Sequence, residues 1–519
     1  MASRPRFAVI GGGVAGLSAA AILSRRADVT VYERAAAPGG KMRQIEIGGR
    51  PIDSGPTVFT MDWAFREVFA LAGGDFDTAV TRRKLDVLAR HYWSDGSCLD
   101  LYADPAKSAA AIAAFAGRVE ADNYLAFCSR TRAVFETLRE PFLRAQKPSF
   151  AGLIARQSPL ALLNTAPFAS LWSVLSRSFS DPRLRQLFAR YATYCGASPF
   201  RAPATLMLIA HVEQAGVWAL DGGMQAIARA LHGLAEGNGA RFRFGAHVDA
   251  IERGPDGRAA GVRLATGEVC PAEGVVANAD AAALATGALG PAGQAALGAA
   301  SVSAERSQSA ITWSLVTQPR GVDLSMHTVF FSDDYPAEFD AVFNGGRVPA
   351  DPTTYVCAQD RAPGMAPPTG PERLLCLINA PATGDTHPQT AEEIAQCQDA
   401  MVTRLKRCGL DLGPGLKTGL KSGPKSGQVT TPADFHALFP ATGGALYGAA
   451  SHGWRASFQR PGARTRLAGL YLAGGSVHPG PGVPMAALSG RAAAQAVMAD
   501  YGLTSPSPQA VMPGGISMP

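Results

Sequence analysis

Short apolar runs, separated by glycines and a helical repeat, open the chain. Residues 6–10 form an apolar run that ends at three consecutive glycines, as in a parallel strand that is buried on both faces. A helical repeat extends from Val14 to Ser24, and residues 29–32 form a second apolar run that ends at Glu33. This order predicts a strand, a helix and a second strand, which is the start of an α/β fold.

The rest of the chain mixes helical and extended patterns. Apolar residues recur at helical spacing from about residue 106 to residue 147. Two glycines after Asp221 introduce a further helix through Leu234, and the Ala/Gly-rich residues 281–304 predict helix and loop. Four more apolar runs are expected to be strands: 242–251, 261–269, 274–277 and 470–473.

One stretch of the chain, residues 158–176, carries no formal charge. A transmembrane helix needs ~20 strongly apolar residues, and prolines, serines and an asparagine interrupt this stretch. An interfacial segment or plain core therefore fits better than a span. If the segment is interfacial, Leu163 and Leu171 are expected to enter the lipid.

Composition excludes several classes of protein. The chain has 519 residues, of which 47% are hydrophobic and 17% charged, which rules out a disordered or collagen-like chain. Its eight cysteines are scattered without a C-x-x-C pair, so we expect no disulfide scaffold and no metal site. The net charge of +6 comes without Lys and Arg clustered between aromatic residues, so nucleic acid is not an expected partner.

A glycine motif follows the first predicted strand. The run Gly11-Gly12-Gly13-Val14-Ala15-Gly16 fits G-x-G-x-x-G. Gly11 permits the tight turn, Gly13 lets the backbone approach a pyrophosphate, and Gly16 lets helix and sheet pack closely. Glu33, at the end of the second strand, would accept a hydrogen bond from a ribose hydroxyl, and an acidic residue there argues against NADP. The alternative is an ordinary glycine-rich turn beside an exposed glutamate.

Two more glycine turns follow soon afterwards, in Pro38-Gly39-Gly40-Lys41 and in Asp53-Ser54-Gly55-Pro56. Their glycines would admit a second length of cofactor backbone, and Lys41 could offset phosphate charge. From the residues alone, they could equally be ordinary turns.

The run Gly11-x-Gly13-x-x-Gly16, followed by Glu33 and by Gly39-Gly40-Lys41, resembles the FAD-binding region of the amine oxidase and phytoene desaturase superfamily. The segment 469–490, with the sequence GLYLAGGSVHPGPGVPMAALSG, is similar to the signature that closes the bacterial carotenoid desaturases. Residues 447–448, 460–461 and 483–488 are most similar to the 1-hydroxycarotenoid 3,4-desaturases within that family. The resemblance covers nearly the whole chain, is strongest at its two ends, and is thin across residues 285–430.

The resemblance implies where FAD would lie. The C-terminal glycines would follow the cofactor, the next helix would direct its N-terminus at the flavin pyrimidine ring, and Val248 would contact adenine through its backbone. Pro484 suits a first helical turn, and a helix dipole there would stabilise negative charge by ~0.3–1 kcal/mol. The alternative is a Pro/Gly loop before a surface helix. His478 could orient the cofactor or be a structural group. The residues expected to hold FAD are Gly11, Gly13, Val14, Ala15, Gly16, Glu33, Gly40, Lys41, Gly55, Pro56, Val248, Gly474, Gly475, Val483, Pro484 and Met485.

The resemblance also implies the fold class, which is α/β. A discontinuous, Rossmann-like FAD-binding domain would carry an inserted, mixed α+β substrate domain with a helical, membrane-facing segment. The FAD-binding domain is expected over 1–80, 220–285 and 440–503, the substrate domain over 81–219 and 286–439, and a loose tail over 504–519.

The activity implied is FAD-dependent desaturation of a long acyclic carotenoid. The resemblance points to C3–C4 of a substrate with a 1-hydroxy or 1-methoxy end, with hydride transfer to flavin N5. It implies peripheral contact with the cytoplasmic side of the inner, photosynthetic membrane, while the oligomeric state stays open. No catalytic side chain follows from the spacing of residues. Three alternatives remain: another flavin oxidase of the superfamily, a redox-neutral carotenoid isomerase, and a non-enzymatic lipid-binding protein like the Rab GDP-dissociation inhibitors.

Overall fold

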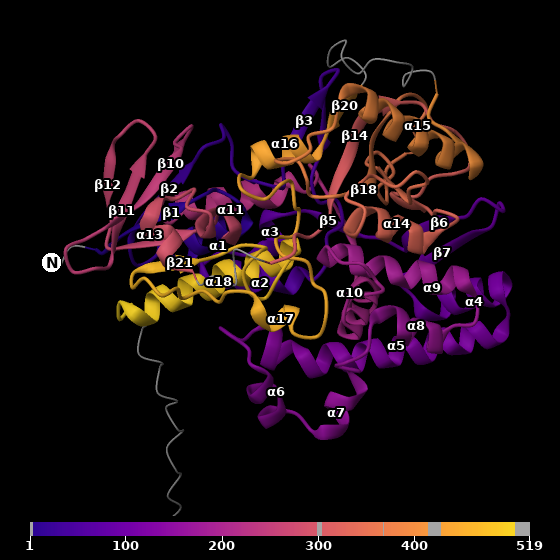
Figure 1. Ribbon diagram of the computed structural model, residues 1–519, viewed down its shortest axis with the longest axis horizontal. Coiled ribbons are helices and arrows are strands. Elements are labelled where there is room, and N and C mark those ends of the chain that lie inside the picture. The colour runs from indigo at the N-terminus through magenta and orange to yellow at the C-terminus, as the bar shows by residue number, and fades with distance from the viewer. Residues whose placement is uncertain (1–3, 298–303, 367, 414–426, 504–519) are drawn as a thin grey trace, which may run out of the picture.

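The computed structural model describes residues 4–297, 304–366, 368–413 and 427–503. Figure 1 shows two main sheets, each with helices beside it, and a group of helices below the second sheet. The tail expected over 504–519 lies outside the described residues, as does the end of the stretch 281–304.

A parallel sheet in the order β21-β13-β1-β2-β9 forms the first layer. Strand β1 pairs in parallel with β2 and β13, and β13 pairs with β21. Strands from distant parts of the chain therefore lie side by side, and the strands predicted at 6–10, 29–33, 274–277 and 470–473 are confirmed. The strands are β1 (Arg6–Ile10), β2 (Asp28–Glu33), β9 (Arg241–Phe244), β13 (Gly274–Ala277) and β21 (Leu470–Leu472).

Both faces of this sheet are covered. Successive side chains of β1 point to opposite sides of the sheet, and each set packs against a different layer. Phe7 and Val9 pack against a layer of helices, whereas Ala8 and Ile10 pack against a three-stranded antiparallel sheet. The helices are α1 (Val14–Leu23), α2 (Asp62–Leu71), α11 (Gln225–Gly237) and α18 (Val483–Asp500). The antiparallel strands are β10 (Val248–Arg253), β11 (Ala259–Leu264) and β12 (Val269–Pro271).

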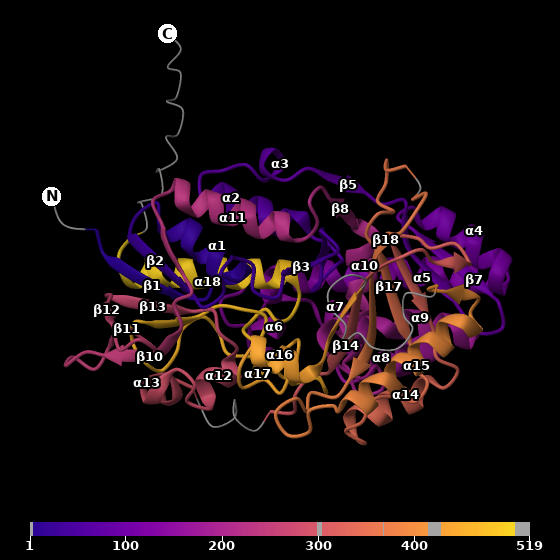
Figure 2. The same cartoon turned by 90° about the horizontal axis from the view of Figure 1, so that it is seen from above.

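Helices α1 and α18 lie side by side in the first layer, as Figures 1 and 2 show. They approach each other most closely at Gly490, where an added Cβ would lie 2.2 Å from the carbonyl oxygen of Ala15 and 2.8 Å from the Cβ of Ser18. Only glycine fits this contact. The last helix of the described chain is thus held against the first.

A mixed sheet in the order β20-β14-β18-β17-β16-β6-β7 forms the second layer. Helix α15 (Ala391–Arg407) covers one face, and the other face looks toward a layer of helices (Figure 1). The strands are β6 (Val87–Tyr92), β7 (Cys98–Tyr102), β14 (Ser309–Thr317), β16 (His327–Phe330), β17 (Thr354–Ala358), β18 (Glu372–Ala380) and β20 (Gly427–Thr430).

The helical layer corrects one prediction. The helical character predicted over 106–147 is confirmed up to Leu143, but Gly117, with φ of +95°, divides the region into α4 and α5. After Leu138 the chain widens into a π-helical turn at Arg139–Leu143 and leaves the helix. The helices of this layer are α4 (Pro105–Ala116), α5 (Arg118–Leu138), α6 (Phe150–Arg156), α7 (Pro159–Asn164), α8 (Leu171–Ser178), α9 (Pro182–Ala189) and α10 (Leu208–Ala215).

Two predicted strands are also wrong in extent. The run 242–251 is split at Gly245, with φ of +69°, so that β9 joins the parallel sheet and β10 joins the antiparallel one. The run 261–269 contains the end of β11 and the first residue of β12, because Gly267, with φ of +89°, reverses the chain between these two strands.

Shorter elements connect the layers. They are β3 (Gln44–Ile47), β4 (Arg50–Asp53), α3 (Phe76–Ala79), β5 (Arg82–Lys84), β8 (Trp218–Leu220), α12 (Ala281–Ala285), α13 (Gly290–Ala295), β15 (Arg320–Gly321), α14 (Tyr335–Phe343), β19 (Leu410–Asp411), α16 (Pro432–Leu438), α17 (Ala456–Gln459), and 3₁₀ turns at Arg190–Cys195 and Ala204–Met207.

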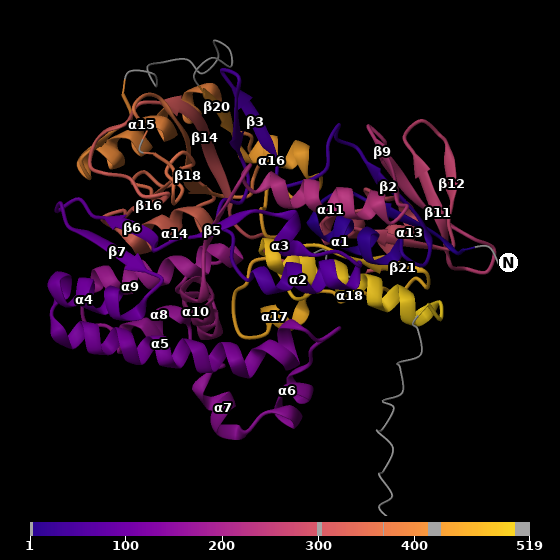
Figure 3. The same ribbon diagram turned by 180° about the vertical axis from the view of Figure 1, so that it is seen from behind.

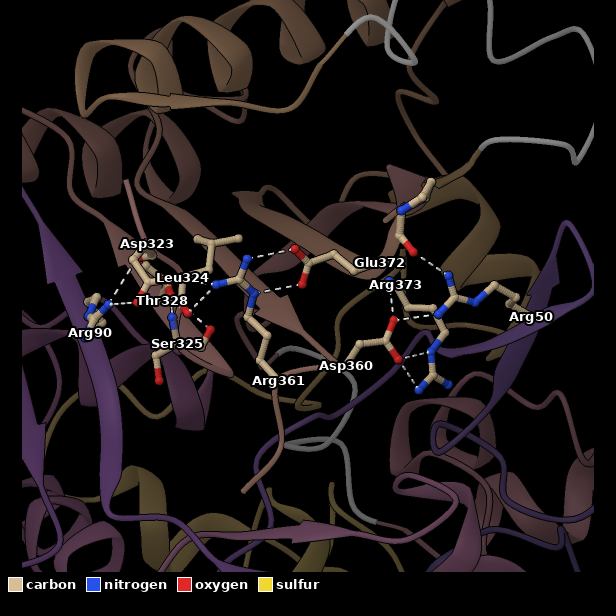
Figure 4. A network of polar contacts seen from close by, with 11 residues as sticks. Arg50, Arg90, Asp323, Leu324, Ser325, Thr328, Asp360, Arg361, Glu372 and Arg373 are labelled. Carbon is tan, nitrogen blue, oxygen red and sulfur yellow. Dashed lines mark hydrogen bonds and ion pairs between the residues drawn. The ribbon is translucent and has the colours of Figure 1, made fainter. Parts of the chain in front are cut away.

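A network of ion pairs ties the β3–β4 hairpin to the second sheet (Figure 4). Arg50 Nη2 lies 2.8 Å from Asp360 Oδ2, and the other oxygen of Asp360 lies 2.7 Å from Arg373 Nη2. Arg373 also donates to the carbonyl oxygen of Pro51 at 2.8 Å. Strand β4 ends just before residues 54–56, so this network fixes their position against the second sheet.

The uncharged stretch 158–176 forms α7 and the start of α8. In the part of the chain that the structure describes, no helix is long and apolar enough to cross a membrane. Leu163 is 71% exposed, but Leu171 is 0% exposed and belongs to the core of the helical layer. The expectation that Leu171 enters lipid is therefore wrong. Helices α6 and α7 lie at the lower edge of the molecule in Figures 1 and 3.

Replacing Gly490 by alanine tests the contact between α1 and α18. We expect Gly490→Ala to lower the free energy of unfolding by about 1–3 kcal/mol, because the new Cβ displaces the Ala15 carbonyl. Thermal unfolding measured by scanning calorimetry would show a lower Tm.

The matched control is Gly233→Ala, in helix α11, where a Cβ meets nothing within 4 Å. This change should leave the Tm unchanged or raise it, because alanine favours the helix by ~1 kcal/mol over glycine. Equal Tm values for Gly490→Ala and the unchanged protein would contradict the close contact.

Candidate functional site

The carboxyl ends of the parallel strands meet at one edge of the first sheet. Gly11 follows β1, Glu33 ends β2, Asn278 follows β13, and Gly474 lies just after β21. Ligands of open α/β sheets bind outside this edge. The two predicted ends of the cofactor site, which are far apart in the sequence, thus lie together in space.

The glycines of the first loop have little room for side chains. Gly11 has a φ of +94°, and a Cβ at Gly16 would lie 2.1 Å from the Gly11 carbonyl oxygen. Helix α1 begins at Val14 with Gly13 as its N-cap, so no side chain caps this end. Ala15 lies in the same first turn. An uncapped N-terminus carries partial positive charge and is a ready site for phosphate.

Glu33 is fixed at the end of β2. Its carboxylate accepts hydrogen bonds from Gly12 N–H at 2.6 Å and from Ala35 N–H at 2.8 Å. An ionised carboxylate has about four acceptor positions, so it can still accept from hydroxyl groups. The N–H of Ala246 donates to the Glu33 carbonyl oxygen at 2.9 Å, which brings Val248, at the start of β10, to the same edge.

The second and third glycine turns stack on the first loop. Gly39 N–H donates to the Gly12 carbonyl oxygen at 2.8 Å, and a Cβ at Gly40 would lie 3.2 Å from Gly13 Cα. A Cβ at Gly55 would lie 1.8 Å from the Lys41 carbonyl oxygen. Gly40, Lys41, Gly55 and the following Pro56 are therefore brought together beside the first loop.

Asn278 joins both ends of the site, and sequence reasoning missed it. Its Oδ1 accepts from Gly16 N–H at 3.0 Å, and its Nδ2 donates to the Ala473 carbonyl oxygen at 2.9 Å. A polar residue directly after the buried strand at 274–277 was the available signal, by the same rule that identified Glu33.

The C-terminal segment returns to the loop as expected. Gly474 N–H donates to Ser489 Oγ at 3.1 Å, and the Gly475 carbonyl oxygen accepts from Arg460 Nη1 at 3.3 Å. Helix α18 begins at Val483, with Pro484 and Met485 in its first turn and no side-chain cap. The site therefore contains a second uncapped helix N-terminus.

Two enclosed cations, Lys41 and Arg460, lie beside these loops. Lys41 Nζ donates to the Leu446 carbonyl oxygen at 2.7 Å, and Arg460 Nη2 donates to the Ala449 carbonyl oxygen at 2.9 Å. Neither forms an ion pair with a carboxylate of the described residues. Desolvation lowers the pKa of both groups, and the charge of Asp280 partly opposes this. Unpaired, enclosed positive charge favours an anionic ligand here.

Five side chains in this part of the molecule are only partly buried. These residues are Lys41, Tyr194, Cys195, Tyr355 and Tyr447.

His478 has a structural role. Its Nε2 donates to the carbonyl oxygen of Phe142 at 2.9 Å, and the two rings lie edge to face. Burial lowers the pKa of His478 to about 4, so the ring is neutral at neutral pH. It ties the C-terminal segment to the helical layer.

The residues present fit FAD. The site offers positive charge at two uncapped helix N-termini and at two unpaired cations, which favours binding of a pyrophosphate and of an electron-rich ring. Glu33 can accept a hydrogen bond from a ribose hydroxyl. The glycine contacts leave the backbone of the loops open to close approach. When bound, FAD would be held by Gly11–Gly16, Glu33, Gly40, Lys41 and the first turn of α18.

The sequence was compared with known proteins. Residues 14–498 match the family described as flavin containing amine oxidoreductase. A hydroxyneurosporene desaturase of Rubrivivax gelatinosus is 48% identical over 99% of this chain and 97% of its own length. A 1-hydroxycarotenoid 3,4-desaturase of a Flavobacterium species is 30% identical over 94% of this chain and 98% of its own length.

Solved structures agree on the fold. Putrescine oxidase bound to putrescine superimposes with a TM-score of 0.60 at 14% identity, over 95% of this chain and 99% of that one. An oxidoreductase of Methanosarcina mazei superimposes with a TM-score of 0.57 at 17% identity, over 95% of this chain and 100% of that one. The family match and the near full-length relatives place this chain in the flavin containing amine oxidoreductase family, among its bacterial carotenoid desaturases.

Proposed function

We propose that this protein desaturates an acyclic carotenoid at C3–C4, next to an oxygen substituent on C1. The observation that carries the proposal is the 48% identity, over 99% of the chain, with a hydroxyneurosporene desaturase.

Bound FAD supplies the redox chemistry, since its ring can accept a hydride from carbon. The protein's own residues would hold the cofactor in place. The N-terminus of α1 and Lys41 would hold phosphate charge, Glu33 would hold a ribose hydroxyl, and the N-terminus of α18 would face the electron-rich ring.

Two side chains near the cofactor loops are uncharged at neutral pH. Burial raises the pKa of the Cys195 thiol to about 11 and that of the Tyr447 phenol to about 12, so both stay protonated. Neither side chain can then act as a strong base.

The alternatives weighed from the sequence are less well supported. An amine or protoporphyrinogen oxidase, a redox-neutral isomerase and a non-enzymatic lipid-binding protein all share the fold. The relatives that are 48% and 30% identical to this chain are named as carotenoid desaturases, and the cofactor loops are intact. These two observations favour an FAD-dependent desaturase.

Carotenoid turnover tests the proposal. The FAD-loaded protein would be incubated with a 1-hydroxy acyclic carotenoid in liposomes, with an electron acceptor present. We expect a product with one more conjugated double bond, which chromatography would separate and whose absorption lies at longer wavelength. An isomer of unchanged mass, or no product from any acyclic carotenoid, would contradict the proposed function.

Removing the charge of Lys41 tests the cofactor site. We expect Lys41→Met to weaken FAD binding about tenfold or more, because a charge-assisted contact is lost. The apoprotein should keep or raise its Tm, because an enclosed, unpaired charge no longer has to be desolvated. Titration of apoprotein with FAD gives the dissociation constant, and calorimetry gives the Tm.

The control is Lys84→Met, at the exposed end of β5, which should change neither value. Normal FAD affinity together with a lower apoprotein Tm in Lys41→Met would assign Lys41 to packing instead.

We further propose that helices α6 and α7 contact the membrane that holds the substrate. Four large apolar side chains of this region are 52–79% exposed, and they are Ile154, Leu160, Leu163 and Phe168. Residues 141–180 contain Arg144, Lys147, Arg156 and Arg177 and no acidic residue. Exposed apolar groups flanked by cations favour an anionic lipid surface. Contact with the cytoplasmic side of a photosynthetic membrane would fit the insolubility of the substrate.

The double change Leu160→Asp and Leu163→Asp tests this surface. We expect weaker binding to liposomes that contain phosphatidylglycerol, since each leucine contributes about 1.5–3 kcal/mol when buried in lipid. Flotation of protein with liposomes measures the bound fraction. The control is Val119→Asp, which changes an isolated valine that is 72% exposed at the start of α5. Equal flotation of the double variant and the unchanged protein would rule out this surface.

A further inference from the structure

We propose that the positive charge of Arg460 raises the reduction potential of bound FAD, and that the negative charge of Asp280 partly opposes it. This inference goes beyond the proposed function, because it requires bound FAD but no particular substrate. It comes from the placement of both charges along residues 473–482, the segment that leads from the first glycine loop to helix α18.

Arg460 is an enclosed cation that neutral groups hold in place. It is 7% exposed. Its Nη1 donates to the carbonyl oxygens of Tyr447 at 3.2 Å and Gly475 at 3.3 Å. Its Nη2 donates to the Ala449 carbonyl oxygen at 2.9 Å and to Ser451 Oγ at 3.3 Å. No carboxylate of the described residues forms an ion pair with it. Because a guanidinium stays protonated in proteins, a full positive charge remains at this position.

The two helix N-termini of the site lie at different places along the cofactor loops. Gly490, which meets Ala15 in the first turn of α1, lies about two helical turns into α18. The start of α18 is therefore about 10 Å beyond the start of α1, measured along α18. One end is available for phosphate, and the other for a more distant part of the cofactor.

Arg460 lies toward the end at which α18 begins. The segment 473–482 leads from Asn278, beside the first turn of α1, to Gly482, the N-cap of α18. A Cβ at Gly480, near the end of the segment, would lie 3.5 Å from Arg460 Nε. Positive charge from Arg460 and from the uncapped start of α18 is therefore concentrated on the side that we expect to face the electron-rich ring.

Asp280 brings a negative charge to the same segment. Its carboxylate caps α12 by accepting from Ala282 N–H at 3.0 Å, and the N–H of Ala281 donates to Ser476 Oγ at 2.9 Å. Ser476 belongs to the segment that Arg460 binds. Burial lowers the pKa of Arg460, and the charge of Asp280 partly opposes this shift. The two charges therefore act in opposite directions on the same place.

The two charges affect the redox states of FAD unequally. Transfer of a hydride, which carries two electrons and one proton, adds one negative charge to bound FAD. In an enclosed site, where water screens charges weakly, Arg460 stabilises the reduced state and Asp280 destabilises it. A cation that acts only on the phosphates leaves the potential unchanged, because their charge is the same in both states. The reduction potential thus separates the two roles.

Anaerobic reductive titration of the FAD-loaded protein tests the inference. Dithionite would reduce the protein together with a reference dye of known potential, and the absorption of the flavin and of the dye would report each reduced fraction. We expect Arg460→Gln to weaken binding of reduced FAD about tenfold relative to oxidised FAD, which lowers the two-electron potential by ~30 mV. Arg460→Lys keeps the positive charge, so its potential should stay close to that of the unchanged protein.

Asp280→Asn should change the potential in the opposite direction. Asparagine keeps the cap of α12 but removes the charge, so the potential should rise. This variant decides the question if Arg460→Gln folds poorly or loses FAD. The matched control is Arg464→Gln, which removes a cation that is 47% exposed and pairs with Asp500. This control should leave the potential unchanged.

Two results would overturn the inference. One is an equal loss of affinity for oxidised and reduced FAD in Arg460→Gln, which would assign this charge to phosphate binding. The other is an unchanged potential in Asp280→Asn. None of these measurements uses a carotenoid, so an absence of carotenoid turnover would overturn the proposed function alone.

Discussion

The close contact between helices α1 and α18 is the constraint on which the cofactor site depends. Gly490 lets the two backbones meet, and the Asn278 amide joins Gly16 N–H to the Ala473 carbonyl oxygen. Because both helices begin without side-chain caps, their positive ends remain available at one edge of the sheet. If the contact opened, the loop that holds phosphate and the segment that faces the ring would no longer be aligned.

A second constraint places the second sheet relative to the cofactor loops. The ion pairs around Asp360 hold the β3–β4 hairpin against the second sheet, and Gln359 donates to and accepts from the backbone of Asp53. Residues 54–57 follow directly and connect the cofactor loops with Tyr355. Hydride transfer is sensitive to small displacements, because the reacting atoms must be held at near-contact distance. The ion pairs and hydrogen bonds that anchor the cofactor loops to the second sheet meet that requirement.

Much of the first sheet could be predicted from the sequence, because its strands are short apolar runs that end at glycines or at polar residues. The turns around Gly40 and Gly55, which were expected to admit cofactor backbone, lie beside the first glycine loop. The breaks at Gly117 and Gly245 were missed, since apolar periodicity continues across both while only a positive φ reveals them. Asn278 was missed although it directly follows a predicted strand, because both of its partners, Gly16 and Ala473, lie more than 100 residues away in the chain.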